Sequence, residues 1–504
     1  MRMLSFFTSS VVLMALLTNC TDKSALMPTM PTVGGPVSTT TIVSLTAITP
    51  APLPVKVDEK LPEGVLHPMA YPSLITGKTE YVSGLNADAL TPVVANVDLG
   101  TLVPKGQSLR MIALGGSLTA GVRNGGLYRE GQLTAYPNLV ARQMGIADFQ
   151  SPTFGPQEAN GTGFYLYDEV ATPYPKWREV VNQKASVQAG DPPVLSAYTG
   201  KIDNYAAPGM GGTAFNFLWY PNSSAYNGTN YKWLPFQLYL WRYMSQEQNQ
   251  LIGLVDEIVA KKPFDFFLLE DKTEGLLKIF KKNDNLRLID FIYELTIGPS
   301  NYEKSIAKLI LGVKKGLIFT VPDPKHYAFM QWYKASDLKK KASLIEITYR
   351  NGGYQEDRIK LDPASNFYFM PTAAVANLFE TQKEGDIVKA TLTDADVMDQ
   401  REVAESNPDY YNQEVVKVAQ KFGLALVDLN SVYKQIYQGT FVAEGGLRID
   451  GSPKGNFFSS DGTYPTAIGQ AVIANEVIKA MNKTYQSRIP LINVSEFAQT
   501  VGAK

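Results

Sequence analysis

Short runs of apolar residues recur along the chain from about residue 108, separated by longer stretches of mixed character. Each run has the length of a strand and stops at a glycine, a proline or a polar residue, which is typical of strands buried on both faces of a parallel sheet. These runs are Ser108–Leu114, Phe264–Leu269, Gly316–Val321 and Leu424–Leu429. The pattern therefore predicts four buried strands.

Apolar positions at helical spacing lie between and after these strands. The clearest segments are Tyr136–Met144, Asp394–Lys421 and the C-terminal Thr466–Tyr485. Strands that alternate with helices predict an α/β fold, in which helices cover both faces of a parallel sheet. In such a sheet the functional residues lie just beyond the carboxyl ends of the strands.

The N-terminus has the pattern of an export signal. Arg2 gives a short positive start, and Leu4–Leu17 is an apolar run too short to cross a bilayer as a helix. The run leads to Cys20, the only cysteine of the chain, in a context that resembles a lipobox. We therefore predict a lipoprotein signal peptide over residues 1–19 and a lipid on Cys20, which would anchor the protein in a membrane.

Residues 20–65 are rich in proline and threonine, which favours an extended and semi-rigid tether. The folded domain is predicted over residues 66–504, with insertions at about 275–310 and 323–390. Asp22, close to Cys20, resembles a surface-export signal of Bacteroides-type lipoproteins. The expected location is the outer membrane on the cell-surface side, with the periplasmic face left open.

Composition and charge exclude some classes of function. The chain has 504 residues, of which 45% are hydrophobic and 19% charged, as in ordinary globular proteins. Its net charge of -1 gives no basic excess, so we expect no nucleic-acid partner. We also expect no metal site and no cofactor.

Two segments near the predicted strand ends resemble one known family. Residues 113–121 read Ala-Leu-Gly-Gly-Ser-Leu-Thr-Ala-Gly, which is similar to the nucleophile block Gly-Asp-Ser-Leu-Thr of SGNH (GDSL-type) hydrolases, with Ser117 as the nucleophile. Residues 204–209 resemble the family's Asn-x-x-x-Pro-Gly segment, in which the N–H of Gly209 would be an oxyanion donor. The resemblance covers roughly residues 106–485 and implies a flavodoxin-like α/β fold.

Two other segments depart from the family pattern. The family's oxyanion asparagine follows a buried strand, but here Glu270 and Asp271 follow it, and only Lys272 is at hand to neutralise them. The family ends in Asp-x-x-His-Pro, and this chain keeps the acid as Asp461 but has Tyr464 at the histidine position. A tyrosine with a pKa near 10 is protonated at neutral pH and is a poor general base.

Three functions are compatible with these features. The first is a catalytically inactive SGNH-like lipoprotein that acts as a binding or scaffold subunit of an outer-membrane complex for assembly, export or uptake, with β-barrel proteins or other lipoproteins as partners. The second is a serine esterase or acylhydrolase that uses Ser117 with an unusual base, for which His326 is the candidate. The third is a non-catalytic glycan-binding module. The loss of two separate catalytic elements favours the first and third over the second.

Overall fold

The structure, a computed structural model, describes the greater part of the predicted domain. The described residues are 75–80, 92–103, 107–168, 174, 176–188, 194–211, 235–244, 253–271, 273–274, 276–277, 302–312, 314–339, 345–351, 355–361, 367–383, 392, 396–398 and 407–501. The predicted signal peptide, Cys20 and the tether lie outside these ranges, and so does Lys272.

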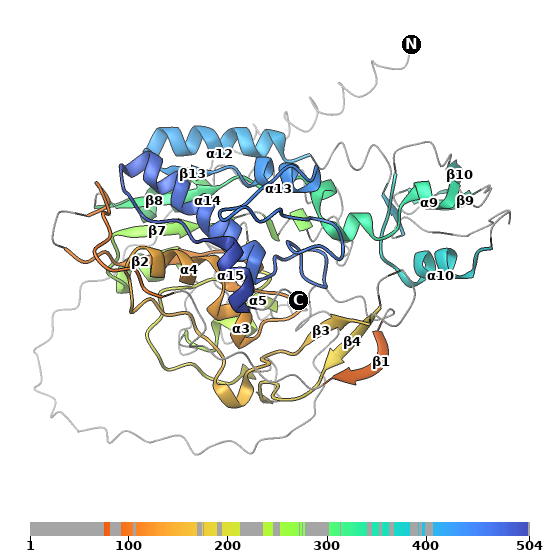
Figure 1. Ribbon diagram of the computed structural model, residues 1–504, viewed down its shortest axis with the longest axis horizontal. Helices are drawn as coiled ribbons and strands as arrows, with labels where there is room; N and C mark the ends of the chain where they lie inside the picture. Colours follow the sequence, from red (N-terminus) through yellow and green to blue (C-terminus); the bar gives the residue numbers. More distant parts are fainter. Residues whose placement is uncertain are drawn as a thin grey trace, which may run out of the picture. The chain divides into compact units, whose positions relative to one another are not determined.

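A four-stranded parallel sheet forms the centre of the fold (Figure 1), as the apolar runs predict. Its strands, in spatial order, are β13 (Ala425–Val427), β8 (Lys315–Phe319), β7 (Phe266–Leu269) and β2 (Met111–Leu114). Every residue of β2 and β7 is buried, because helices cover the sheet. The predicted α/β fold with a parallel sheet flanked by helices is therefore confirmed.

A short extended segment continues the sheet beyond β2. Asn204 forms an isolated parallel bridge with Ala113. Ala113 N–H donates to the Asp203 carbonyl at 2.8 Å, and Tyr205 N–H donates to the Ala113 carbonyl at 2.8 Å. With this segment counted as the second strand in chain order, the spatial order is second, first, third, fourth, fifth, which is the flavodoxin-like order. It places residues 204–209 directly beside the strand that carries Ser117.

The helices that pack around this sheet include α4 (Tyr136–Gln143), α12 (Asp409–Phe422) and α14 (Ala467–Tyr485). The helix α14 contacts β13, α4 and the C-terminal α15 (Val494–Val501), while α12 contacts β8 and β13. The side chain of Thr466 accepts the N–H of Gly469 and so caps α14 at its first turn.

The predicted helix Asp394–Lys421 is wrong at the residues ahead of Asp409 that the structure describes. Val397 and Met398 form the short strand β12, which pairs with β11 (Tyr368–Phe369), and the helix begins only at Asp409. Pro408 immediately precedes it and is well suited to a helix start, because its missing N–H would have had no helical partner there. At Val397 and Met398 the apolar spacing therefore reflects buried strand residues and not a helix.

The remaining elements are short. The other helices are α2 (Ser117–Ala120), α3 (Arg129–Leu133), α5 (Pro235–Leu240), α6 (Leu254–Lys261), α9 (Ala335–Lys339), α10 (Ala373–Thr381) and α13 (Leu429–Tyr437), with 3-10 turns η3 (Pro156–Glu158), η6 (Pro324–His326) and η7 (Ala328–Gln331). The other strands are β1 (Ile75–Glu80), β3 (Phe164–Tyr167), β4 (Trp177–Val180), β5 (Val187–Gln188), β6 (Val194–Leu195), β9 (Ile345–Asn351) and β10 (Gln355–Leu361). They form a β1-β4-β3 sheet, a β5-β6 pair and a β9-β10 hairpin.

The two predicted insertions are described only in part. Residues 302–309 are helical and place Tyr302, Ile306 and Leu309 in the core ahead of β8. The second predicted insertion holds α9, the β9-β10 hairpin, β11 and α10. The aromatic residues of 327–333 are buried, so this segment belongs to the core. The domain limits themselves stay predictions.

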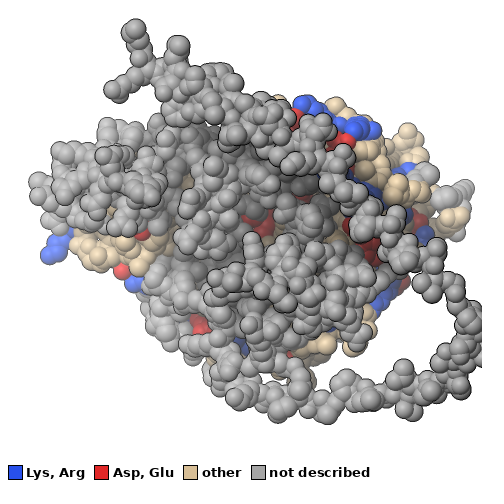
Figure 2. All heavy atoms as spheres, turned by 180° about the vertical axis from the view of Figure 1, so that it is seen from behind, with Lys and Arg blue, Asp and Glu red and all other residues tan. Residues whose placement is uncertain are grey.

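On the face drawn in Figure 2, the described residues carry charges of both signs. Figure 2 shows Lys and Arg atoms beside Asp and Glu atoms, and on that face neither sign gathers into a large patch among the described residues. Within the same residues, no helix combines the length and the apolar character that crossing a membrane requires.

Candidate active site

Ser117 lies on a tight turn between β2 and α2, at the carboxyl end of the first sheet strand. Glycines are needed there because the chain passes very close to its neighbours. A Cβ on Gly115 would lie 2.2 Å from Thr119 Oγ1, and a Cβ on Gly116 would lie 2.5 Å from the Met210 carbonyl oxygen. The side chain of Ser117 is completely buried.

Residues 204–209, which continue the sheet beside β2, contact the Ser117 turn. Gly209 has a φ of +79°, which favours glycine, and its N–H donates to Ser117 Oγ at 3.2 Å. Asn204 Nδ2 donates to the Thr119 carbonyl at 3.1 Å, which fixes the segment to α2. Ser117 and Gly209 are thus neighbours in space, although 92 residues separate them in the chain.

Asp461 and Tyr464 reach the same place from the loop before α14. Asp461 Oδ1 accepts the N–H groups of Thr463 at 2.7 Å and of Tyr464 at 2.8 Å, while Oδ2 accepts the N–H of Gly125 at 2.9 Å. Both carboxylate oxygens of Asp461 therefore bind backbone. Asp461 holds the loop, and the hydroxyl of Tyr464 is bound by a different acid.

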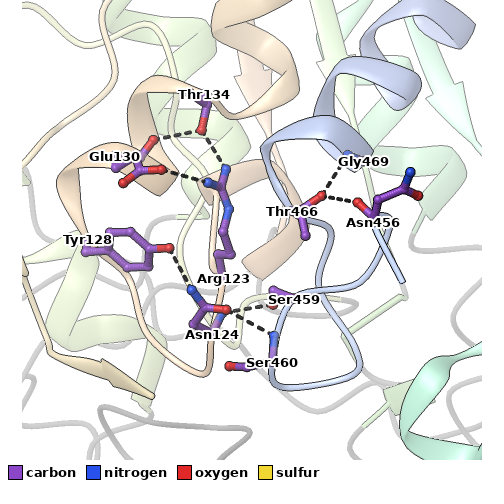
Figure 3. Close-up of polar contacts among 10 residues, drawn as sticks. All are labelled: Arg123, Asn124, Tyr128, Glu130, Thr134, Asn456, Ser459, Ser460, Thr466 and Gly469. Atoms are coloured by element: carbon purple, nitrogen blue, oxygen red, sulfur yellow. Dashed lines mark hydrogen bonds and ion pairs between the residues drawn. The ribbon is translucent and has the colours of Figure 1, made fainter. Parts of the chain in front are cut away.

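Asn124 locks the loop after α2 to the loop before α14 (Figure 3). Its backbone N–H donates to Ser459 Oγ at 2.9 Å, and its Oδ1 accepts the N–H of Ser460 at 3.0 Å. Its Nδ2 donates to Tyr128 OH at 3.1 Å. With a φ of 55°, Asn124 adopts a conformation that asparagine tolerates better than most residues. These bonds fix Ser117 and Tyr464 relative to each other.

Figure 3 also shows further polar contacts of the same two loops, made by Arg123 and Thr466. The buried Arg123 donates to Thr134 Oγ1 at 2.5 Å and pairs with Glu130 at 3.4 Å. Thr466 Oγ1 donates to the Asn456 carbonyl at 2.5 Å while it caps α14. Both loops that carry the site are therefore tied to neighbouring elements by hydrogen bonds.

Glu270 directly follows β7, and its carboxyl group lies beside the Ser117 turn. Its Oε2 accepts the N–H of Gly116 at 3.1 Å and Thr119 Oγ1 at 3.3 Å. The side chain is 1% exposed. Burial, with smaller contributions from the charges of Glu274 and Asp271, raises the pKa of Glu270 to about 7, although the hydrogen bond from the Gly116 N–H opposes the rise.

Glu274 is the functional residue that the sequence reasoning missed. Its Oε2 accepts the N–H of Ser117 at 3.2 Å, and both its carboxylate oxygens accept the Tyr464 hydroxyl at 3.0 Å. The exposed fractions of Glu274, Tyr464 and Ser117 are 4%, 1% and 0%. No motif in the sequence marks Glu274, which lies five residues after the end of β7. The N–H that would face an oxyanion in a hydrolase thus faces a carboxylate.

The hydroxyl of Tyr464 cannot act as a base in this environment. Burial and the negative charge of Glu274 raise the pKa of Tyr464 well above 10, and the neighbouring Ser117 side chain lowers it only in part. A group that holds its proton at every physiological pH does not activate a serine hydroxyl.

His326, the candidate for a displaced base, lies in η6, which follows β8. It is buried, its ring packs against Tyr437 of α13 at a centroid distance of 5.3 Å, and burial lowers its pKa. Its backbone N–H donates to the Asp323 carbonyl at 3.0 Å. Within the described residues no hydrogen bond connects His326 to Ser117. In the same ranges, no group of three or more His, Cys, Asp or Glu residues is placed to hold a metal ion.

The sequence matches no protein-family description and no curated protein. Among solved structures it is similar to an α/β hydrolase enzyme from the metagenome of Lake Arreo, Spain (12% identity, 76% of this chain, 98% of that chain, TM-score 0.28). It is also similar to the extracellular lipase from Streptomyces rimosus (11%, 75%, 100%, 0.30) and to an acetylxylan esterase from Geobacillus stearothermophilus (12%, 75%, 97%, 0.27). Because these TM-scores are low, the assignment of the fold rests on the strand order and not on these likenesses.

Proposed function

We propose that this protein is a non-hydrolytic lipoprotein, in which an SGNH-hydrolase-like domain serves as a binding scaffold within an outer-membrane protein complex. The pattern that ends in Cys20 supports a lipid anchor, and the proline-rich residues that follow support a tether. The partners are β-barrel proteins or other lipoproteins of an assembly, export or uptake system. The fold is kept because its stability comes from the sheet and helices, while turnover depends on a few loop residues.

The observation that carries the loss of turnover is the position of Glu274. Its carboxylate accepts both the Ser117 N–H and the Tyr464 hydroxyl. A developing oxyanion would have to compete with a carboxylate for the Ser117 N–H. The loss of one oxyanion donor typically costs about 2.7–4 kcal/mol of transition-state stabilisation, and a nearby negative charge adds to that cost. The absence of a base at position 464 lowers the rate further.

A serine esterase remains the second candidate, because of one specific arrangement. Ser117, Tyr464 and Glu274 follow each other in space as hydroxyl, hydroxyl and carboxylate, an order that resembles the serine, base and acid of a hydrolase, with Glu274 in the role of Asp461. A proton could pass from Ser117 to Glu274 only if the Tyr464 hydroxyl accepted the serine proton while it gave its own proton to Glu274. The burial of all three side chains leaves an ester no access to Ser117 in this conformation.

Ester hydrolysis by the full-length chain in detergent tests the first part of the proposal. Short acyl esters are assayed with the wild type and with Ser117→Ala, and a fluorophosphonate probe is applied to both. We expect no hydrolysis and no labelling that depends on Ser117. Activity and labelling that disappear in Ser117→Ala would establish the esterase instead.

Purification of the lipidated chain from its own membranes tests the second part. A complex with a barrel protein or another lipoprotein that survives size-exclusion chromatography is the expected result, and its loss in Cys20→Ser would assign it to the anchored form. A monomeric protein that binds a polysaccharide column would support the glycan-binding module and contradict the scaffold.

A further inference from the structure

We propose that the Ser117 turn and the Tyr464 hydroxyl form a carboxylate-binding site, which this chain fills with its own Glu274. The ligand class is a small free carboxylate of the size of acetate or propionate. This inference rests on the proposed function, because it describes what the hydrolase-like site does when no ester is turned over.

The donors of this site converge on one carboxylate from two loops. Ser117 N–H comes from the start of α2 and lies 3.2 Å from Glu274 Oε2. Tyr464 OH comes from the loop before α14 and lies 3.0 Å from each of the two oxygens. Hydrogen bonds from an N–H or O–H group to an ionised carboxylate are stronger than neutral ones. The bonds of Asn124 and Asp461 hold the two loops together, so the donors are fixed in place independently of Glu274.

The space at this point is also suited to a carboxylate. A Cβ on Gly116 would lie 3.2 Å from Glu274 Oε2, so a side chain at this position would crowd the bound oxygen. Glu274 is 4% exposed, and the surrounding side chains leave little contact with water. Two fixed hydrogen-bond donors at this buried position suit a carboxylate group.

Occupation by Glu274 has a direct consequence for ligands. A free carboxylate, or the carbonyl of an ester, must displace a tethered carboxylate whose effective concentration at the site is high. The wild-type chain therefore keeps the site closed, and removal of the Glu274 side chain beyond Cβ opens it. The cavity that remains holds the same two donors without their acceptor.

The test is chemical rescue of Glu274→Ala in the full-length chain in detergent. The midpoint of thermal unfolding is measured with increasing sodium acetate and propionate, and with acetamide and propionamide at the same ionic strength. A pH of about 6 is used because Glu270, with a pKa of about 7, is then mostly protonated and repels the added anion less. Wild type and Glu414→Ala serve as controls, since Glu414 pairs with Lys417 on the outside of α12.

We expect acetate and propionate to raise the midpoint of Glu274→Ala by about 2 °C or more, as preferential binding to the native state requires. The amides should not do so, and the two controls should not respond. Equal shifts in all three proteins, or equal shifts with acid and amide, would overturn the proposal.

If Glu274→Ala does not fold by itself, refolding from urea with propionate replaces the thermal measurement. Recovery of the native circular dichroism with propionate but not with propionamide supports the site, and failure of both to restore it overturns the site. Neither readout depends on turnover. An esterase activity of the wild type would refute the proposed function and leave the rescue result to be judged separately.

Discussion

The pH dependence of stability should report directly on Glu270, and the structure sets its size. Burial raises the pKa of Glu270 from 4.5 to about 7. A shift of this size, at 1.36 kcal/mol per pKa unit, corresponds to about 3 kcal/mol. Glu270→Gln removes the titration and keeps the shape of the side chain, including an oxygen that can accept the N–H of Gly116.

The sign follows from the direction of the shift. Because the native state binds the proton of Glu270 more tightly than the unfolded state, the contribution to stability is fully present below the unfolded pKa. It is lost as the pH rises through the folded pKa of about 7. The wild type should therefore lose about 3 kcal/mol relative to Glu270→Gln between about pH 4.5 and about pH 8.

Urea unfolding of both proteins over this pH range measures the effect. His326 and Glu130 also have shifted pKa values, lowered and raised respectively, but they are common to both proteins and cancel in the difference. Glu414→Gln is a control on the surface of the same domain. Parallel pH profiles of wild type and Glu270→Gln would refute the view that burial of this carboxyl dominates its titration.

Three packing predictions follow from other buried contacts. Arg242→Met should lower the free energy of unfolding by about 3 kcal/mol in urea denaturation, because the buried guanidinium donates to three backbone carbonyls, and a loss below about 1 kcal/mol would contradict this. Tyr485→Phe should lower the free energy of unfolding by about 1–2 kcal/mol in the same assay, since the Tyr485 hydroxyl donates to the Gly316 carbonyl at 2.6 Å. An unchanged urea midpoint would show that this hydrogen bond does not stabilise the fold. Gly316→Ala should lower the free energy of unfolding by about 1–3 kcal/mol, because the new Cβ would lie 2.2 Å from the ring of Phe267. In thermal unfolding, the double variant with Phe267→Leu should recover part of the lost stability.

The strands could be predicted from the sequence because each is a continuous apolar run buried on both faces. The observed strand Phe266–Leu269 lies inside the predicted Phe264–Leu269, and the observed Ala425–Val427 lies inside Leu424–Leu429. The predicted helix from Asp394 failed at Val397 and Met398, because apolar periodicity alone does not distinguish a short buried strand from a helix. Pro408 was the local signal for the true start of that helix.

The candidate site was predictable only where a local motif marked it. Ser117 and Gly209 lie in short segments whose glycines show where the chain turns, so their neighbourhood in space follows once the strand order is known. Glu274 had no such mark. Its bond to Ser117 joins residues 157 positions apart, and the bond of Asn124 to Ser459 joins residues 335 apart. Contacts of this range depend on how the loops pack and not on their own sequence pattern.

Glu270 and Glu274, which accept N–H groups of the Ser117 turn, link the two segments that differ from the hydrolase pattern. An asparagine after β7 would offer an amide to an oxyanion, but Glu270 instead accepts the N–H of Gly116. A histidine at position 464 would have to stand beside Glu274, where the tyrosine hydroxyl now donates to both carboxylate oxygens. Where the hydrolase pattern has groups that serve a reacting ester, this chain has an internal carboxylate or a hydrogen-bond partner of one. These segments therefore form one hydrogen-bonded unit, in which introducing a single hydrolase-like residue would leave the other acid in place and the site still closed.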